Sequence, residues 1–89
     1  RLGGEEFAVI SLDTGKAGTL ALAERMRAAI EHSEVPGVGA DQPLRCTVTI
    51  GISDAFSSTQ ALDEAMQQAD AALYRGKSCG RNRIEWALA

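Results

Sequence analysis

The sequence has few aromatic residues, little histidine, no excess of basic charge and no long apolar run, and these scarcities exclude several common classes of protein. Aromatic residues make up 4% of its 89 residues, histidine occurs once, and the net charge is −3. An acidic chain lacks the basic surface of a general nucleic-acid binder. No apolar run approaches the roughly 18 residues that suggest a membrane span. The composition is that of an ordinary globular protein, and the net charge does not exclude a local basic site for one nucleotide.

Cysteine and histidine are also too sparse to indicate a site of their own. Cys46 and Cys79 lack the short spacing of zinc ligands. We expect reduced thiols in a cytosolic protein, with a disulfide or a ligand role as the alternative. His32 stands beside Glu31 and Ser33 near a predicted helix end. A solvated or capping role therefore fits His32 better than a catalytic one.

Hydrophobic periodicity predicts helices that alternate with strands. Residues 44–53 alternate with period two, which predicts a half-buried strand. Apolar residues recur at helical spacing in two segments, the second with the stripe Leu62, Met66, Ala69 and Leu73. We expect strands at 7–12, 44–53 and 82–86, and helices at 16–32 and from about 57 to 77. This order predicts one small α/β or α+β domain of two or three layers, with Phe7 in its core.

The chain begins with an acidic turn, Gly3-Gly4-Glu5-Glu6, directly before the apolar run that starts at Phe7. Paired glycines permit a tight turn because they accept positive φ. Carboxylates at the mouth of a sheet cost free energy unless a cation or a donor-rich ligand meets them. The turn therefore favours a metal or phosphate site. The alternative is a pair of solvated carboxylates in an ordinary turn.

A cationic cluster follows the second predicted helix, where Lys77 and Arg81 flank its end. The helix dipole favours cations at this position, which is one explanation. The other is that both side chains bind one polyphosphate. The lysine ammonium group would act as a point charge, and the planar arginine guanidinium group could donate two parallel hydrogen bonds. Nucleotide chemistry needs both clusters, since a metal bridges phosphate oxygens and cations neutralise the remaining charge.

These residues resemble the GGDEF family of diguanylate cyclases, in the form that has Glu in place of the Asp. The turn and Phe7 match the signature, and other blocks follow in family order. These blocks are Ala23-Glu24-Arg25, Thr47-Val48-Thr49-Ile50-Gly51, Ala69-Asp70-Ala71-Ala72-Leu73-Tyr74 with Lys77, and Gly80-Arg81-Asn82. The resemblance covers almost the whole chain, and residues 1–89 correspond to the C-terminal part of a single GGDEF domain. We expect Ala69, Asp70 and Tyr74 to fix their helix on the sheet.

The resemblance implies an α+β, palm-type domain similar to that of adenylyl cyclases. It implies that two such domains form a homodimer and condense two GTP molecules into cyclic di-GMP and pyrophosphate. The cofactor would be Mg²⁺ or Mn²⁺. The implied roles are metal binding and catalysis by Glu5, a second required acid at Glu6, close backbone approach at Gly3 and Gly4, and phosphate binding by Lys77 and Arg81. Glu in place of Asp keeps a hard oxygen ligand.

The family pattern also implies parts that would precede Arg1. They are the central strand with the other metal-binding Asp, a guanine-contacting helix, and in many members an inhibitory Arg-x-x-Asp site. We expect the strand-helix-strand-helix-strand fragment alone to be inactive, and its open sheet edges to pair with another chain. We expect a sensory or receiver domain in a cytoplasmic parent protein, and leave a membrane anchor open. One alternative is a degenerate GGDEF domain that regulates by binding GTP or a protein. The other is a structural ferredoxin-like domain whose turn only resembles the signature.

Overall fold

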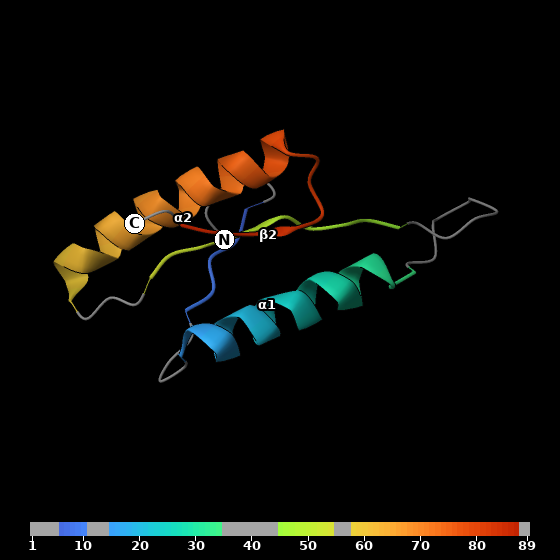
Figure 1. The fold of residues 1–89 in the computed structure, drawn as a ribbon, viewed down its shortest axis with the longest axis horizontal. Coiled ribbons are helices and arrows are strands. Elements are labelled where there is room, and N and C mark those ends of the chain that lie inside the picture. The colour runs from blue at the N-terminus through green and yellow to red at the C-terminus, as the bar shows by residue number, and fades with distance from the viewer. Residues whose placement is uncertain (1–5, 11–14, 35–44, 55–57, 88–89) are drawn as a thin grey trace.

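The fold is a small mixed α/β arrangement of two helices and a two-stranded sheet. The computed structural model describes residues 6–10, 15–34, 45–54 and 58–87. The elements are α1 (Lys16–Glu31), β1 (Ile50–Ile52), α2 (Thr59–Ser78) and β2 (Ile84–Trp86). In Figure 1 the short strands lie between the two long helices, with α2 on one side and α1 on the other. None of the helices in the described ranges is long and apolar enough to span a bilayer.

The two strands are parallel and in register, with Ile50 opposite Ile84 and Ile52 opposite Trp86. The Ile50 N–H donates to Arg83 O at 2.9 Å, and the Ala87 N–H donates to Ile52 O at 2.7 Å. Parallel neighbours need a long crossover, and α2 provides it. The unit β1–α2–β2 is therefore a βαβ unit, which brings the C-terminal end of α2 next to the start of β2.

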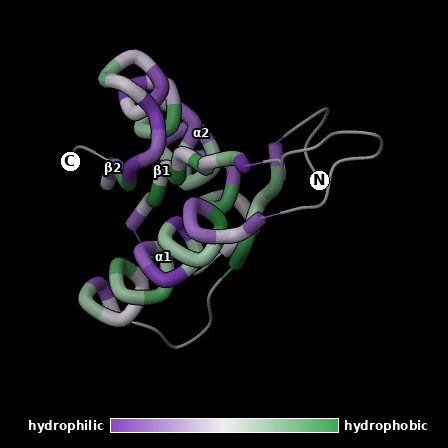
Figure 2. Tube along the Cα trace, turned by 90° about the vertical axis from the view of Figure 1, so that its right-hand side faces the viewer, coloured by the Kyte–Doolittle hydropathy of each residue, from purple (hydrophilic) through white to green (hydrophobic). Residues whose placement is uncertain are grey.

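Both helices lie close to the predicted ranges. Ser58 caps α2, because its side chain accepts a hydrogen bond from the Ala61 N–H at 3.1 Å. Gly80 follows the helix with φ of 117°, a conformation that glycine adopts easily. Figure 2 shows hydrophilic and hydrophobic residues in alternation along both helices, as expected of helices that turn one face to a sheet.

The strand predictions were less accurate. Residues 7–10 form no strand, and Phe7 is 71% exposed, so its predicted place in the core is wrong. Val9 and Ile10 are also exposed. The sheet of the described residues contains only β1 and β2, and residues 7–10 belong to neither strand. The strand predicted at 44–53 shortens to Ile50–Ile52, and residues 11, 12 and 44 lie outside the described ranges.

The core consists of small side chains. The buried hydrophobic residues of the described ranges are Ala23, Ile52, Ala65, Ala72 and Ala87. A Cβ placed on Gly51 would lie 2.2 Å from the Ala69 carbonyl oxygen, so β1 and α2 are in backbone contact there. The alternation had assigned Gly51 to the polar face of a half-buried strand. That face packs directly on α2, and small residues make the contact close.

Candidate functional site

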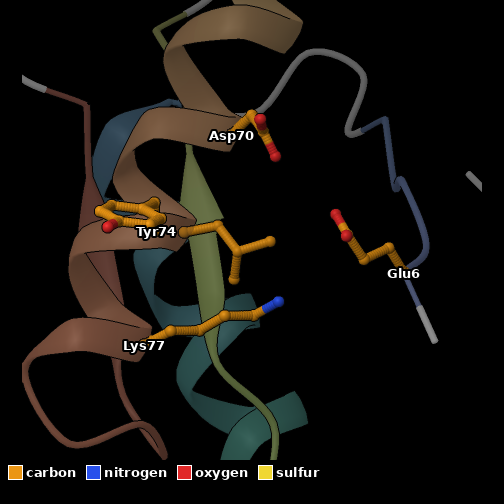
Figure 3. Close-up of a pocket in the computed structure, with 5 residues that line it drawn as sticks. Glu6, Asp70, Tyr74 and Lys77 are labelled. Atoms are coloured by element: carbon orange, nitrogen blue, oxygen red, sulfur yellow. The ribbon is translucent and has the colours of Figure 1, made fainter.

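A pocket of about 150 Å³ lies between residue 6 and one face of α2. Glu6 enters it from one side, and Asp70, Leu73, Tyr74 and Lys77 line the other (Figure 3). The four residues of α2 follow helical spacing, which places them on neighbouring turns of one face. Figure 3 shows that Glu6, Asp70 and Lys77 point toward the same space. The fold thus brings the residue after Glu5 next to the C-terminal half of α2.

The pocket combines two carboxylates with one ammonium group. Glu6 and Lys77 are half-buried, whereas Asp70 is exposed and Tyr74 is 73% exposed. Among the described residues, Lys77 takes part in no ion pair within 4 Å. Lys77 thus presents a cationic group to the pocket, and a cation in a partly desolvated pocket attracts phosphate oxygens strongly.

Several residues of the pocket also line a larger groove of about 1750 Å³ between residues 6–10, α1, α2 and the sheet. Arg81 lines this groove together with Glu6 and Lys77. Leu22, Met26 and Ile52 are among its apolar lining residues. The predicted site residues Glu6, Lys77 and Arg81 therefore share one groove, whereas Gly3, Gly4 and Glu5 lie outside the described residues.

Arg81 belongs to a turn with unusual backbone geometry. Gly80, Arg81 and Asn82 have φ values of 117°, 64° and 49°. The Arg81 N–H donates to Gly76 O at 2.9 Å, and the Asn82 N–H donates to the Thr49 hydroxyl oxygen at 3.1 Å. The turn is thus tied to both α2 and the residue just before β1.

A cluster of charged and polar side chains joins this turn to α1. Arg27 donates to the Asn82 side-chain oxygen at 2.9 Å and to Glu24 at 2.9 Å, and it lies 3.5 Å from Glu31. The Asn82 amide donates to Glu31. This hydrogen bond is the main reason that the pKa of Glu31 falls below its ordinary value, and the hydrogen bond from Arg27 lowers the pKa of Glu24. Hydrogen bonding to Glu24 raises the pKa of Arg27, which keeps its charge.

Two pocket residues were assigned the wrong role from sequence. Asp70 and Tyr74 were expected to fix α2 on the sheet, but both are exposed and line the pocket. Ala69 does make the expected contact, through its carbonyl oxygen next to Gly51. The seven-residue spacing of Asp70 and Lys77 would have indicated a shared face.

The remaining candidates lie outside the pocket. Cys46 and Cys79 are free and exposed thiols, as predicted. His32 is exposed, with its ring 3.7 Å from Glu31. No group of three metal-ligating side chains gathers within the described ranges. The groove presents the cationic side chains of Lys77 and Arg81 together with the carboxylate of Glu6.

The chain matches a known protein family over most of its length. Residues 1–83 match the family described as "Diguanylate cyclase, GGDEF domain". The chain belongs to this family, and its predicted membership is confirmed.

Individual relatives show how much of a longer protein the chain matches. It is 41% identical over 87 residues to diguanylate cyclase DgcP of Pseudomonas aeruginosa, covering 98% of this chain and 12% of the relative. It is 34% identical over 84 residues to diguanylate cyclase A of Treponema denticola, covering 94% and 22%. The response regulator PleD of Caulobacter vibrioides is also 34% identical over 84 residues, covering 94% and 18%. The chain thus spans about a fifth or less of these relatives.

Proposed function

We propose that this chain is the C-terminal part of a palm-type GGDEF domain in a diguanylate cyclase. The parent enzyme condenses two GTP molecules into cyclic di-GMP and pyrophosphate. The observation that supports this best is the groove shared by Glu6, Lys77 and Arg81 in a chain of the GGDEF family. An acid near the reacting atoms and two cations for the phosphates are what nucleotidyl transfer needs, because positioning and charge neutralisation dominate its catalysis.

Each proposed role follows from the chemistry of the side chain. Lys77 and Arg81 bind the terminal phosphates and neutralise charge on the leaving pyrophosphate. Glu6 is a required acid beside them, and Glu5 lies close to the attacking ribose 3′-hydroxyl. Gly3 and Gly4 let the backbone approach the nucleotide. Each domain holds one GTP, so the reaction requires a second domain that faces the first in a homodimer.

The proposed metal is Mg²⁺ or Mn²⁺, bound through Glu5. Carboxylate oxygens suit both ions, but the described residues do not form a complete cation site. When bound, the metal would polarise phosphate oxygens. This chain supplies one side of such a site, and the other metal-binding acid is proposed to lie in the preceding part of the domain.

The roles are tested in the full-length protein by steady-state kinetics of cyclic di-GMP formation. Lys77→Ala and Arg81→Ala are expected to raise the KM for GTP by roughly 10–100-fold, the loss of a charge-assisted hydrogen bond. Glu5→Gln and Glu6→Gln are expected to lower kcat with a smaller effect on KM. Arg25→Ala is the matched control, because Arg25 is exposed on α1 and does not line the groove. Equal effects of Arg25→Ala and Arg81→Ala would contradict the assignment.

The 89-residue chain alone is proposed to be inactive, since it lacks the second metal-binding acid. Incubation with GTP and Mg²⁺ followed by chromatography should show no cyclic di-GMP. Formation at a rate near that of the full-length protein would contradict the proposal.

The second candidate is a GTP-binding regulatory module, favoured by cations in the groove without a metal cluster in the described ranges. Under that function, full-length Glu5→Gln would keep both GTP affinity and its regulatory effect.

A further inference from the structure

The turn from Gly80 to Asn82 keeps three consecutive residues at positive φ. Glycine tolerates this region and asparagine is enriched there. Arginine is not, and a non-glycine residue in the left-handed region persists only where its surroundings hold it. Arg81, at φ of 64°, therefore depends on contacts made by its neighbours.

Asn82 makes these contacts with two other parts of the fold. Its backbone N–H donates to Thr49 at 3.1 Å, just before β1. Its side chain accepts from Arg27 at 2.9 Å and donates to Glu31, both on α1. One asparagine thus connects the end of α2 to the strand region and to the opposite helix, across 51 and 55 residues of sequence.

Arg27 is held firmly enough to act as an anchor. Its side chain is only 17% exposed, and its guanidinium group contacts both Glu24 and Glu31. A planar guanidinium with several fixed partners has little freedom to move. The position of the Asn82 side chain is therefore defined by α1 and not by the turn alone.

We propose that Asn82 and Arg27 are positioning residues that hold the Gly80–Asn82 turn so that Arg81 faces the groove and binds phosphate. The inference rests on the proposed function, because it assigns the support for one of its phosphate-binding residues. Neither Asn82 nor Arg27 touches the substrate in this proposal. Their effect passes through the backbone of Arg81, which also donates to Gly76 O at 2.9 Å.

The test compares Asn82→Ala, Arg81→Ala and the double variant in the full-length protein. Asn82→Ala is expected to raise the KM for GTP by about tenfold, as for one charge-assisted hydrogen bond. The double variant should have the KM of Arg81→Ala alone, since both changes remove the same contact. Multiplied effects in the double variant would overturn the proposal.

A control separates positioning from stability. Ser58→Ala removes the cap at the far end of α2 and should lower the melting temperature without changing the KM. If Asn82→Ala likewise lowers only the melting temperature, Asn82 is merely structural and the proposal is wrong. Arg27→Lys keeps the positive charge but removes the planar guanidinium group that donates several hydrogen bonds at once. It should therefore reproduce part of the Asn82→Ala effect, and a KM equal to wild type would count against the role of Arg27.

A second readout needs no substrate. The backbone amides at positions 81 and 82 should exchange hydrogen faster in Asn82→Ala than in the wild type if the turn loses its support. If these amides exchange faster in Asn82→Ala but the KM for GTP is unchanged, Asn82 does support the turn. The proposed link between that support and phosphate binding by Arg81 would then be wrong. If Arg81→Ala itself leaves the KM unchanged while exchange accelerates in Asn82→Ala, the proposed role of Arg81 fails, and the positioning proposal fails with it. Unchanged exchange in Asn82→Ala would overturn the positioning proposal while leaving the proposed function intact.

Discussion

The contact between Gly51 and α2 offers a sharp test of the fold. A Cβ on Gly51 would lie 2.2 Å from the Ala69 carbonyl oxygen and 2.5 Å from the Leu73 backbone nitrogen. Both atoms belong to the helix backbone, so no side-chain rotation can relieve the overlap. Gly51→Ala must therefore push α2 away from β1. We expect a loss of about 1–3 kcal/mol in the free energy of unfolding, the usual cost of overpacking.

Gly76→Ala is the matched control, because Gly76 lies in α2 against the same sheet. Its nearest neighbour would be the Thr49 methyl carbon at 2.7 Å, part of a side chain that can shift. Alanine also favours a helix interior over glycine by about 1 kcal/mol. The steric contact with Thr49 lowers stability and the higher helix propensity of alanine raises it. Gly76→Ala is therefore expected to change the free energy of unfolding by less than Gly51→Ala.

Urea unfolding, followed by circular dichroism and by the fluorescence of Trp86, measures both variants. Coincident transitions from the two probes support a two-state analysis. For a domain of this size the expected loss lowers the melting temperature by roughly 5–20 °C. A Gly51→Ala variant as stable as Gly76→Ala would refute the backbone contact between β1 and α2.

Three further outcomes follow from the structure. Ser58→Ala removes the acceptor for the Ala61 N–H, so urea titration should show a loss of about 1 kcal/mol. The pKa of Glu31 is lowered from 4.5, so its contribution to stability is present above that pH and is lost as the pH falls through the lower, folded value. Glu31→Gln should thus flatten the acid side of the stability profile, and an unchanged slope would contradict this. The exposed apolar residues 7–10 and the short sheet should make the isolated chain self-associate. Light scattering would show this, Val9→Lys should reduce it, and a monomer at all concentrations would argue against it.

Much of the local structure could be predicted from short-range patterns. Helical periodicity and the Ser58 cap placed α2 to within a few residues of its observed bounds. Such signals act between residues three or four apart and need no partner. The positions of Lys77 and Arg81 in the sequence likewise indicate the cationic end of this helix.

The strands and the pocket depended on contacts distant in sequence. The run from Phe7 has the composition of a buried strand, yet Phe7, Val9 and Ile10 lie exposed in the described structure. Composition alone does not show whether a segment finds the partner that a strand needs for its hydrogen bonds. Asp70 was identified as a pocket residue only when Glu6 was placed opposite α2. No local pattern indicated that Asn82 would contact Arg27.

The sequence by itself determined the family and the two helices, since motifs and helical periodicity are local properties of the chain. The tertiary structure decided which charges share a groove and which residues contact the turn at Asn82. These depend on how α1, α2 and the sheet pack, and packing follows from backbone contacts such as that of Gly51 with Ala69, which join residues far apart along the chain.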